Sequence, residues 1–303
     1  MDIKHTPVLL NKIYKEIFKP TDNLILDATV GEGGYSAFFL EKGVKKVIGL
    51  EQDKEILTRA LSRLKPYGKA FTGYNLNFAE ASEIFEKYYG KIDLALYDLG
   101  ISMYHYKQSK RGFSYTSNEA PDMRLNLNNK LTATFVINNY SAGRLADIIY
   151  QYGGERKSRQ IAAAIVKERS RSPITSAQRL AELTKPFYPP APPIHPATRT
   201  FQALRIFVNR ELDSLRRSLP AAIKALAPGG RIAVVAYHSL EDAIVKNSFR
   251  SFIPEKKNIN KYRESSSKGK YYLLCKKPLR PAAQEVAANP SSRSAKLRAL
   301  ARV

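Results

Sequence analysis

The fold is decided by the stretch Leu24-Ile25-Leu26-Asp27-Ala28-Thr29-Val30-Gly31-Glu32-Gly33-Gly34-Tyr35. It begins with three apolar residues typical of a buried strand, continues with an acid, and ends in a glycine-rich turn. An apolar helical pattern follows at Ser36-Ala37-Phe38-Phe39-Leu40. Glycines let such a turn adopt positive φ and let a ligand approach the backbone closely. In open α/β folds a cofactor binds at this place, beside the carboxyl ends of the strands.

A second acid follows the next predicted strand. Glu51 comes directly after Lys46–Leu50 and is placed to bind the hydroxyls of a ribose. The dinucleotide fingerprint G-x-G-x-x-G is not met, because Ser36 stands where it needs its third glycine, and this disfavours a dehydrogenase. The glycines alone fit an ordinary strand–turn–helix connection. Together with Asp27 and Glu51 they favour S-adenosylmethionine, a nucleoside cofactor without a pyrophosphate, and hence a methyltransferase.

The composition is ordinary apart from its charge. The 303 residues include 50 Lys and Arg against 27 Asp and Glu, which gives a net charge of +23 spread along the chain. A surplus of this size indicates a polyanionic partner, and nucleic acid is the favoured class.

Metal-binding and membrane-spanning patterns are missing from the sequence. Cys275 is the single cysteine, and the four histidines show no metal-ligand spacing, so we expect neither a disulfide nor a metal site. No apolar run is long enough to span a bilayer, and the N-terminus lacks the apolar core of a signal peptide. We therefore expect no membrane contact and a cytoplasmic location.

Strand and helix signals alternate in two separate parts of the chain. They run from Leu24 to Asp98 and resume with a strand at Arg231–Ala236, with polar and helical sequence between them. This pattern predicts an α/β fold in which a mostly parallel sheet is interrupted by a helical insertion. We assign residues 1–104 and 201–303 to the sheet domain and residues 105–200 to the insertion.

Individual elements can be placed within these parts. Three helices are expected in the insertion, at Ala142–Tyr152, Glu155–Arg169 and Ser176–Leu183. The prolines between Pro186 and Pro196 predict extended chain. A long amphipathic helix is expected over Phe201–Ala227, before Pro228-Gly229-Gly230. A basic segment spans 255–280, and its Tyr271-Tyr272-Leu273-Leu274 is a candidate terminal strand.

Several irregular blocks further along the chain carry a specific resemblance. They are Lys110–Tyr115, Pro121–Arg124, His195–Arg205, Tyr237–Asp242 and Asn289–Lys296. With them the chain resembles the MraW family of bacterial methyltransferases, from His5 to Arg298. The resemblance implies a class I methyltransferase fold, which is Rossmann-like, with an inserted helical domain for substrate recognition. It also implies S-adenosylmethionine as the cofactor, and 16S ribosomal RNA of the small ribosomal subunit as the partner. The target would be the exocyclic N(4) amino group of a cytidine in the decoding region, at the P site.

The same resemblance implies which residues contact the cofactor. These are Gly33, Gly34, Tyr35, Glu51, Phe78, Asp98 and His105. The chain departs from the usual family pattern at some of them: Glu51 replaces Asp, Tyr35 replaces His, and His105 replaces Gln. Each nitrogen of a neutral imidazole either donates or accepts one hydrogen bond. The amide of Gln has an NH₂ group that donates and a carbonyl oxygen that accepts.

Transfer to an exocyclic amine needs a group that accepts its proton. Asp98, at the end of the predicted strand Ile92–Asp98, is our first candidate, with Ser102 as support. His238 follows another strand end and is a candidate for gripping the base or relaying the proton. Each residue also has a structural alternative. An acid such as Asp98 often caps a helix, and a lone histidine such as His238 usually has a structural role.

The target base must leave its stack before its amino group can be reached. We assign the substrate contacts to Arg111, Arg124, His195 and Arg199, where the last two orient their loop or bind phosphate. Two alternatives stay open: a methyltransferase of DNA or another RNA, and a non-catalytic RNA-binding factor for ribosome assembly. The sequence does not decide between a monomer and a homodimer.

Overall fold

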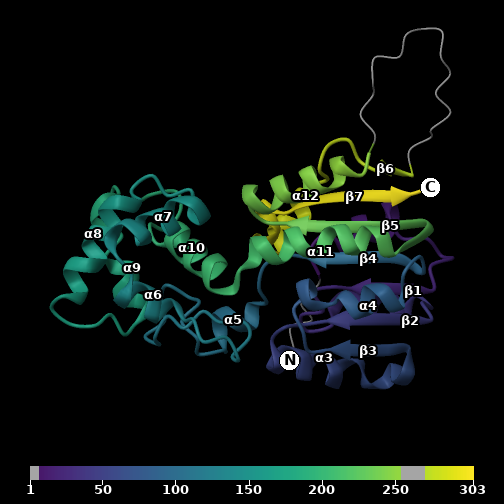
Figure 1. Cartoon of the computed structure of the whole chain (residues 1–303), viewed down its shortest axis with the longest axis horizontal. Coiled ribbons are helices and arrows are strands. Elements are labelled where there is room, and N and C mark those ends of the chain that lie inside the picture. Colours follow the sequence, from purple (N-terminus) through teal and green to yellow (C-terminus); the bar gives the residue numbers. More distant parts are fainter. Residues whose placement is uncertain (1–6, 254–269) are drawn as a thin grey trace, which may run out of the picture. The chain divides into compact units, whose positions relative to one another are not determined.

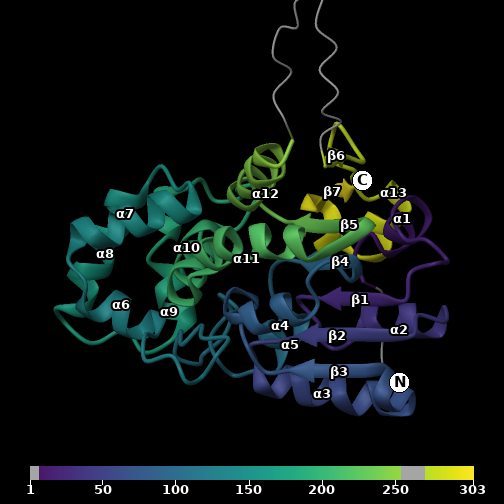
Figure 2. The same ribbon diagram turned by 45° about the vertical axis from the view of Figure 1, so that its right-hand side comes forward.

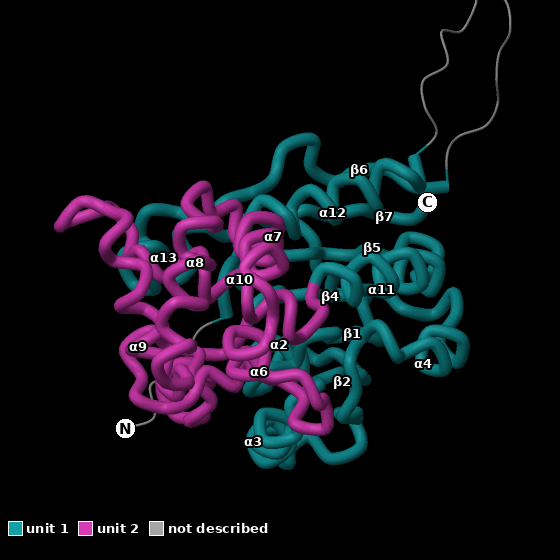
Figure 3. The backbone as a smooth tube through the Cα atoms, turned by 60° about the vertical axis from the view of Figure 1, so that its left-hand side comes forward, with its two compact units in different colours: residues 1–100, 212–303 teal, residues 101–211 magenta. Residues whose placement is uncertain are grey.

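The chain divides into two compact units in the computed structural model, which describes residues 7–253 and 270–303 (Figure 1). Unit 1 comprises residues 1–100 and 212–303, and unit 2 comprises residues 101–211 (Figure 3). The insertion is therefore longer at both ends than the expected range of 105–200. At its C-terminal end the reason is packing, because Phe201, Leu204 and Val208 are buried in the core of unit 2.

The described residues of unit 1 form a seven-stranded sheet in the order β3-β2-β1-β4-β5-β7-β6. The strands are β1 (Leu24–Asp27), β2 (Lys46–Leu50), β3 (Phe71–Tyr74), β4 (Ile92–Asp98), β5 (Leu226–Ala236), β6 (Tyr271–Leu273) and β7 (Lys296–Arg302). Strands β1 to β5 are parallel, whereas β7 is antiparallel to both of its neighbours, β5 and β6. The arrows of β1, β2 and β3 accordingly point to the same edge in Figure 2. The expected α/β fold with a mostly parallel sheet is confirmed.

Helices cover both faces of this sheet, and this explains why its strands are apolar on both sides. Side chains alternate between the faces along a strand, so Ile25 packs into one core and Leu26 into the other. The first core includes side chains of α1 (Leu10–Glu16), α2 (Gly34–Glu41) and α3 (Lys54–Leu64). The second includes side chains of α4 (Ser82–Lys87), α11 (Glu211–Ala225) and α12 (Ser239–Ser251). Unit 1 also contains α13 (Ala283–Ala288) and the 3-10 helices η1 (Lys65–Ala70), η2 (Phe78–Glu80) and η4 (Pro290–Ser294).

The start of β5 differs from the expectation. Leu226 pairs with Ile92, and Arg231 pairs with Leu94, so residues 227–230 form a bulge within the strand. A bulge accommodates Pro228, which has no N–H to donate to a ladder. The expectation of one continuous helix over Phe201–Ala227 is also wrong. This segment forms two helices, because Arg210 adopts a left-handed conformation with φ 51° between them.

Unit 2 is helical and has a hydrophobic core of its own. Its elements are α5 (Met103–Lys107), α6 (Ala133–Asn139), α7 (Ala142–Gly153), α8 (Ser158–Arg169), α9 (Ala177–Glu182), the 3-10 helix η3 (Lys185–Phe187) and α10 (Thr198–Asn209). The three helices expected here are confirmed as α7, α8 and α9. The proline run is only partly extended, because Pro186 lies in the first turn of η3, where its missing N–H is tolerated.

The C-terminal part of unit 1 contains two antiparallel strands. The expected terminal strand is confirmed as β6, whereas β7 was not expected from the sequence. Of the basic segment 255–280, residues 255–269 lie outside the described residues, as do His5 and Thr6 at the start of the resemblance. Within the described residues, no helix has both the length and the apolar character needed to cross a membrane.

Candidate active site

The turn after β1 is organised around Asp27. This carboxylate is 1% exposed, and it accepts hydrogen bonds from Ser36 Oγ at 2.7 Å and from Thr29 N at 3.3 Å. Burial raises the pKa of Asp27 to about 6. Asp27 therefore ties the end of β1 to the first turn of α2, and Ser36 is needed here as its hydroxyl donor.

Two glycines of the turn have positive φ, 55° at Gly31 and 80° at Gly33, where side chains are rarely tolerated. Among the described residues, a Cβ on Gly31 would meet only the carbonyl oxygen of Thr29, at 3.9 Å. A Cβ on Gly34 would instead lie 2.7 Å from Pro7 Cγ. Gly34 is thus required by packing, whereas Gly31 leaves its backbone open to a ligand.

Glu51 connects this turn to the loop after β2. Its Oε2 accepts a hydrogen bond from Gly31 N at 3.1 Å, and its Oε1 accepts one from Asp53 N at 2.9 Å. Burial raises the pKa of Glu51 to about 7. Each carboxylate oxygen has two lone pairs, so further donors can bind beside these two N–H groups.

Asp98 ends β4 at the same edge of the sheet. Its backbone N donates to Thr29 Oγ1 at 2.6 Å, and its Oδ1 accepts a hydrogen bond from Tyr237 Oη at 2.7 Å. Burial raises the pKa of Asp98 to about 7, the hydrogen bond from Tyr237 lowers it, and the charges of Asp27 and Glu241 raise it. Asp98 does not cap a helix, because the N-cap residue of the next helix, α5, is Ser102.

His238 is the N-cap residue of α12. Its Nδ1 accepts a hydrogen bond from Glu241 N at 3.4 Å, while Glu241 Oε2 accepts one from His238 N at 3.3 Å. This reciprocal arrangement is a capping box. Glu241 is 3% exposed and also binds the backbone N of Tyr237 at 2.8 Å. The structure thus gives His238 a structural role, and its expected catalytic role stays a prediction.

Two other expected cofactor residues of unit 1 differ in their exposure. Tyr35 is 4% exposed, and its hydroxyl donates to the carbonyl oxygen of Val8. Burial raises the pKa of Tyr35, so this phenol stays protonated. Phe78 is half-buried, and its ring packs edge-on against that of Tyr97 at 5.5 Å between centroids. The Tyr35 side chain therefore serves packing, and the expected contact of Phe78 with the cofactor stays a prediction.

Ser102 and His105 belong to unit 2. Ser102 Oγ accepts a hydrogen bond from Tyr104 N at 3.1 Å, as expected of a helix cap. His105 is 5% exposed, and its ring packs against that of Phe113 at 5.2 Å between centroids. The expected contacts of Ser102 and His105 with substrate and cofactor stay predictions.

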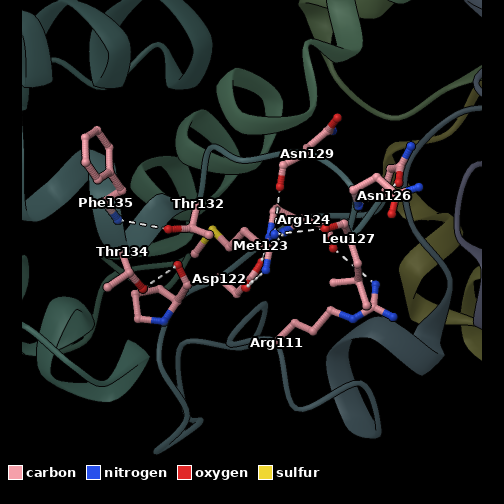
Figure 4. Close-up of polar contacts among 12 residues, drawn as sticks. Arg111, Asp122, Met123, Arg124, Asn126, Leu127, Asn129, Thr132, Thr134 and Phe135 are labelled. Carbon is pink, nitrogen blue, oxygen red and sulfur yellow. Dashed lines mark hydrogen bonds and ion pairs between the residues drawn. The ribbon is translucent and has the colours of Figure 1, made fainter.

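Two arginines that we assigned to the substrate hold a loop of unit 2 together (Figure 4). Arg111 is 6% exposed and donates to the carbonyl oxygens of Arg124 and Leu125 at 3.1 and 3.3 Å. Arg124 binds both carboxylate oxygens of Asp122, at 2.8 and 2.7 Å, and donates to the carbonyl oxygen of Asn129 at 2.7 Å. These contacts do not support the assignment of Arg111 to the substrate, because its guanidinium is buried and used by the backbone.

His195 and Arg199 lie near the start of α10. The His195 ring stacks on that of Tyr115, with 4.0 Å between centroids and 5° between planes, and its Nδ1 accepts a hydrogen bond from Ala197 N. Burial lowers the pKa of His195. These contacts give His195 a structural role within its loop, and its expected contact with the substrate stays a prediction. Arg199 is exposed in the first turn of α10.

The edge formed by β1, β2 and β4 gathers three carboxylates with raised pKa values, those of Asp27, Glu51 and Asp98. The charge of Asp27 raises the pKa of each of the other two. A ligand with a positive charge and hydroxyl donors would stabilise their ionised forms. S-adenosylmethionine has a sulfonium, an ammonium and a ribose diol, so these residues fit it. In residues 7–253 and 270–303, no three His, Cys, Asp or Glu side chains are grouped so that they could hold a metal ion.

Comparison with known proteins identifies the family. The model of the MraW methylase family matches residues 2–303. This chain belongs to the MraW methylase family. It is 42% identical over 316 residues to the ribosomal RNA small subunit methyltransferase H of Treponema denticola, with 99% of this chain and 97% of the relative covered. The protein of the same name from Heliobacterium mobile is 39% identical over 310 residues, with 98% of each chain covered.

Solved structures align with this MraW-family chain at low sequence identity. One is a putative methyltransferase from Streptococcus mutans in complex with SAH, with a TM-score of 0.40, 10% identity, and coverage of 93% of this chain and 89% of that one. The mostly parallel seven-stranded sheet, together with membership of a methylase family, confirms the expected class I methyltransferase fold, and the family match confirms the expected use of S-adenosylmethionine.

Sequence reasoning missed some of the groups around Asp98 in this MraW-family chain. The Thr29 hydroxyl and the Tyr237 hydroxyl both bind Asp98, and Glu241 fixes the turn that carries Tyr237. The spacing from His238 to Glu241 was an available signal, since an N-cap residue followed by Glu three positions later marks a capping box. The Tyr237 hydroxyl had no such signal, because the pairing of β4 with β5 brings it to Asp98.

Proposed function

We propose that this chain transfers a methyl group from S-adenosylmethionine to the exocyclic N(4) amino group of a cytidine in the decoding region of 16S ribosomal RNA, at the P site. Family membership and the names of the relatives support ribosomal RNA of the small subunit as the substrate. The net charge of +23 supports a polyanionic substrate. The cytoplasm, where ribosomal subunits are assembled, is the compartment that this proposal implies.

The turn after β1 and the acid after β2 would hold the donor. Bound there, S-adenosylmethionine supplies an electrophilic methyl group on a positively charged sulfur. The open backbone at Gly31 and the Glu51 carboxylate would contact its nucleoside, with Glu51 accepting hydrogen bonds from the ribose hydroxyls. The carboxylates of Asp27 and Asp98 would offset its positive charge.

The observation that carries the proposal is the position of Asp98, which ends β4 at the edge that also holds Asp27 and Glu51 and accepts a hydrogen bond from Tyr237. The Asp98 pKa of about 7 lets it be ionised in a large share of molecules near neutral pH and still bind a proton well. An exocyclic amine is a weak nucleophile, because its lone pair is delocalised into the ring. Asp98 would accept a hydrogen bond from the N(4) amino group and so orient the lone pair of the nitrogen. It would then take the proton that the nitrogen loses when the new bond to the methyl carbon forms.

Tyr237 would keep Asp98 in place for this step. Its hydroxyl donates to Oδ1, and Oδ2 of the same carboxylate is then available for the amine. The exposed Arg199 of unit 2 would bind backbone phosphate, and the target base would have to leave its stack before it could react.

The test is incubation of this protein and labelled S-adenosylmethionine with small subunits from cells that lack the protein. Nuclease digestion and nucleoside analysis then identify the modified base. We expect label in N(4)-methylcytidine at one position, and labelling that is slower by about 10²- to 10⁴-fold with Asp98→Asn. Label in another nucleoside, or preferential label in DNA, would contradict the proposed target. Donor binding without any transfer to small subunits would favour the assembly-factor alternative.

A further inference from the structure

A basic pocket lies on unit 1, between the second half of α12 and the chain that follows β6. Its volume is about 250 Å³. Its walls are formed by the following residues: Lys246, Phe249, Arg250, Leu273, Cys275, Lys276, Lys277, Pro278 and Arg298. Cofactor and drug pockets usually have volumes of about 300–1,000 Å³, so this pocket suits a smaller group such as one phosphodiester with its sugar.

The charges around this pocket are not balanced. Arg298 is paired with Asp242, whose carboxylate binds its Nε at 2.6 Å and its Nη2 at 3.2 Å. The other four cationic side chains of the pocket form no ion pair within the described residues: Lys246, Arg250, Lys276 and Lys277. A concave surface with four cations that form no ion pair within the described residues attracts anions, and the half-buried Leu273 on its wall can contact a sugar.

The position of the pocket on α12 relates it to the carboxylate edge. The N-cap residue of α12, His238, directly follows Tyr237, whose hydroxyl binds Asp98. Lys246 and Arg250 lie 8 and 12 residues further along, which corresponds to about 12 and 18 Å along a helix at 1.5 Å per residue. A nucleic acid strand with its target base at Asp98 can reach this pocket with a nucleotide a short distance along the strand.

We propose that this pocket binds a backbone phosphate of the RNA substrate, away from the nucleotide that is methylated. This inference rests on the proposed function and adds to it the place where unit 1 holds the strand. The ligand chemistry is a phosphodiester, since the pocket offers several point charges and few fixed hydrogen-bonding groups that would read a base. Binding there is independent of sequence and sensitive to salt.

The test compares two double variants of the full-length protein in binding to unmethylated small subunits. Lys246→Gln/Arg250→Gln removes two charges from the pocket. Lys45→Gln/Lys69→Gln removes two exposed charges near the amino ends of β2 and β3. These ends lie at the edge of the sheet opposite to the carboxyl ends, where Asp98 lies. Filter binding over a range of salt concentrations needs no turnover. For the pocket variant we expect the slope of log affinity against log salt to fall by about 0.7, the value for one phosphate contact on a single strand, with about tenfold weaker binding near physiological salt. The control should match wild type.

Cys275 gives a second readout, because it lines the pocket and is the only cysteine in the chain. We expect small subunits to protect Cys275 from modification by N-ethylmaleimide. Inorganic phosphate, at a concentration equal to that of the RNA phosphates in the small subunits, should protect Cys275 far less. Equal salt slopes for both double variants, or unprotected Cys275 in the RNA complex, would overturn the inference. These outcomes do not depend on methyl transfer, so they are distinct from failure of the proposed function, which is measured as N(4)-methylcytidine.

Discussion

The hydroxyl of Tyr237 donates a hydrogen bond to Oδ1 of Asp98 at 2.7 Å and so joins the ends of two adjacent parallel strands. A donor to a carboxylate favours its ionised form and lowers its pKa. The Asp98 pKa of about 7 thus results from burial, which raises it, opposed by Tyr237. This contact therefore lowers the pH at which Asp98 becomes ionised and able to accept a proton.

Tyr237→Phe should move the acid limb of the pH–rate profile to higher pH. Without the hydroxyl the pKa of Asp98 rises, so a smaller fraction is ionised near neutral pH and kcat falls severalfold there. At higher pH the rate should recover. Tyr97→Phe is a matched control, because it also removes a buried hydroxyl of the same unit, one that binds Ser218 at 2.6 Å. A uniform loss of rate at every pH in Tyr237→Phe would show that Tyr237 does not act through the ionisation of Asp98.

Asp98→Asn should abolish most of the activity and stabilise the fold at alkaline pH. Loss of a positioned general base reduces the rate by about 10²- to 10⁴-fold. The pKa of Asp98 is raised in the folded state, so its contribution to stability is present below its unfolded pKa and is lost as the pH rises through about 7. Near pH 8 we expect the variant to gain about 1–2 kcal/mol in its free energy of unfolding, and little near pH 4. Denaturant unfolding at the two pH values measures this difference, and full turnover by the variant would exclude Asp98 from the mechanism.

His238 has a structural role as an N-cap residue and a predicted role in catalysis. A substituted residue that caps helices but cannot relay a proton separates these two roles. Asn is a good N-cap residue, whereas Ala is not, so His238→Ala should cost about 1 kcal/mol of stability and His238→Asn much less. Because the structure shows a capping box, we expect His238→Asn to keep its kcat within a few fold of wild type. Thermal unfolding and initial rates measure both effects. A stable His238→Asn protein without turnover would instead support proton relay or base binding by His238.

Arg111 and Arg199 should behave differently on substitution. Arg111→Ala leaves two backbone carbonyl groups of its loop without their donor, and each such buried group costs about 1–3 kcal/mol. We therefore expect lower thermal stability. Arg199→Gln should leave stability unchanged, weaken binding to small subunits, and lower the salt slope by about 1, since Arg199 is exposed. Unchanged RNA affinity in Arg199→Gln would contradict phosphate binding by this residue.

The sheet and the acids at its edge could be predicted because each depends on local sequence. Apolar runs that end in an acid marked β1 and β4, and Glu51 followed β2 directly. The break at Arg210, where φ is 51°, could not be predicted, because it depends on tertiary packing: Val208 before it is buried in the core of unit 2, and Leu215 after it is buried in a core of unit 1. Strand β7 could not be predicted either. Its sequence KLRALAR does not by itself indicate a strand, and the strand forms through pairing with β5 and β6 on either side.

The candidate site divides in the same way. The residue types of the Arg111 and Arg124 blocks suggested RNA contacts, whereas their guanidinium groups are used by nearby carbonyl and carboxylate oxygens. Sequence shows that a charge is present, but only the folded loop shows whether that charge is already paired. The basic pocket shows the opposite case, since Lys246 and Lys276 are far apart in sequence and adjacent only in the fold.

Binding of the methyl donor at Glu51 is the central step of the proposed function, and calorimetric titration with S-adenosylmethionine tests it directly. Hydroxyl donors favour ionised Glu51, whose pKa is about 7, so affinity should rise with pH between about 6 and 8 and binding near pH 7 should release protons to the buffer. Glu51→Gln should weaken binding by about tenfold or more and reduce this proton release, while the exposed-site control Glu86→Gln should match wild type. Saturable binding with the same affinity and proton release in Glu51→Gln, or no binding by folded wild-type protein, would contradict the account.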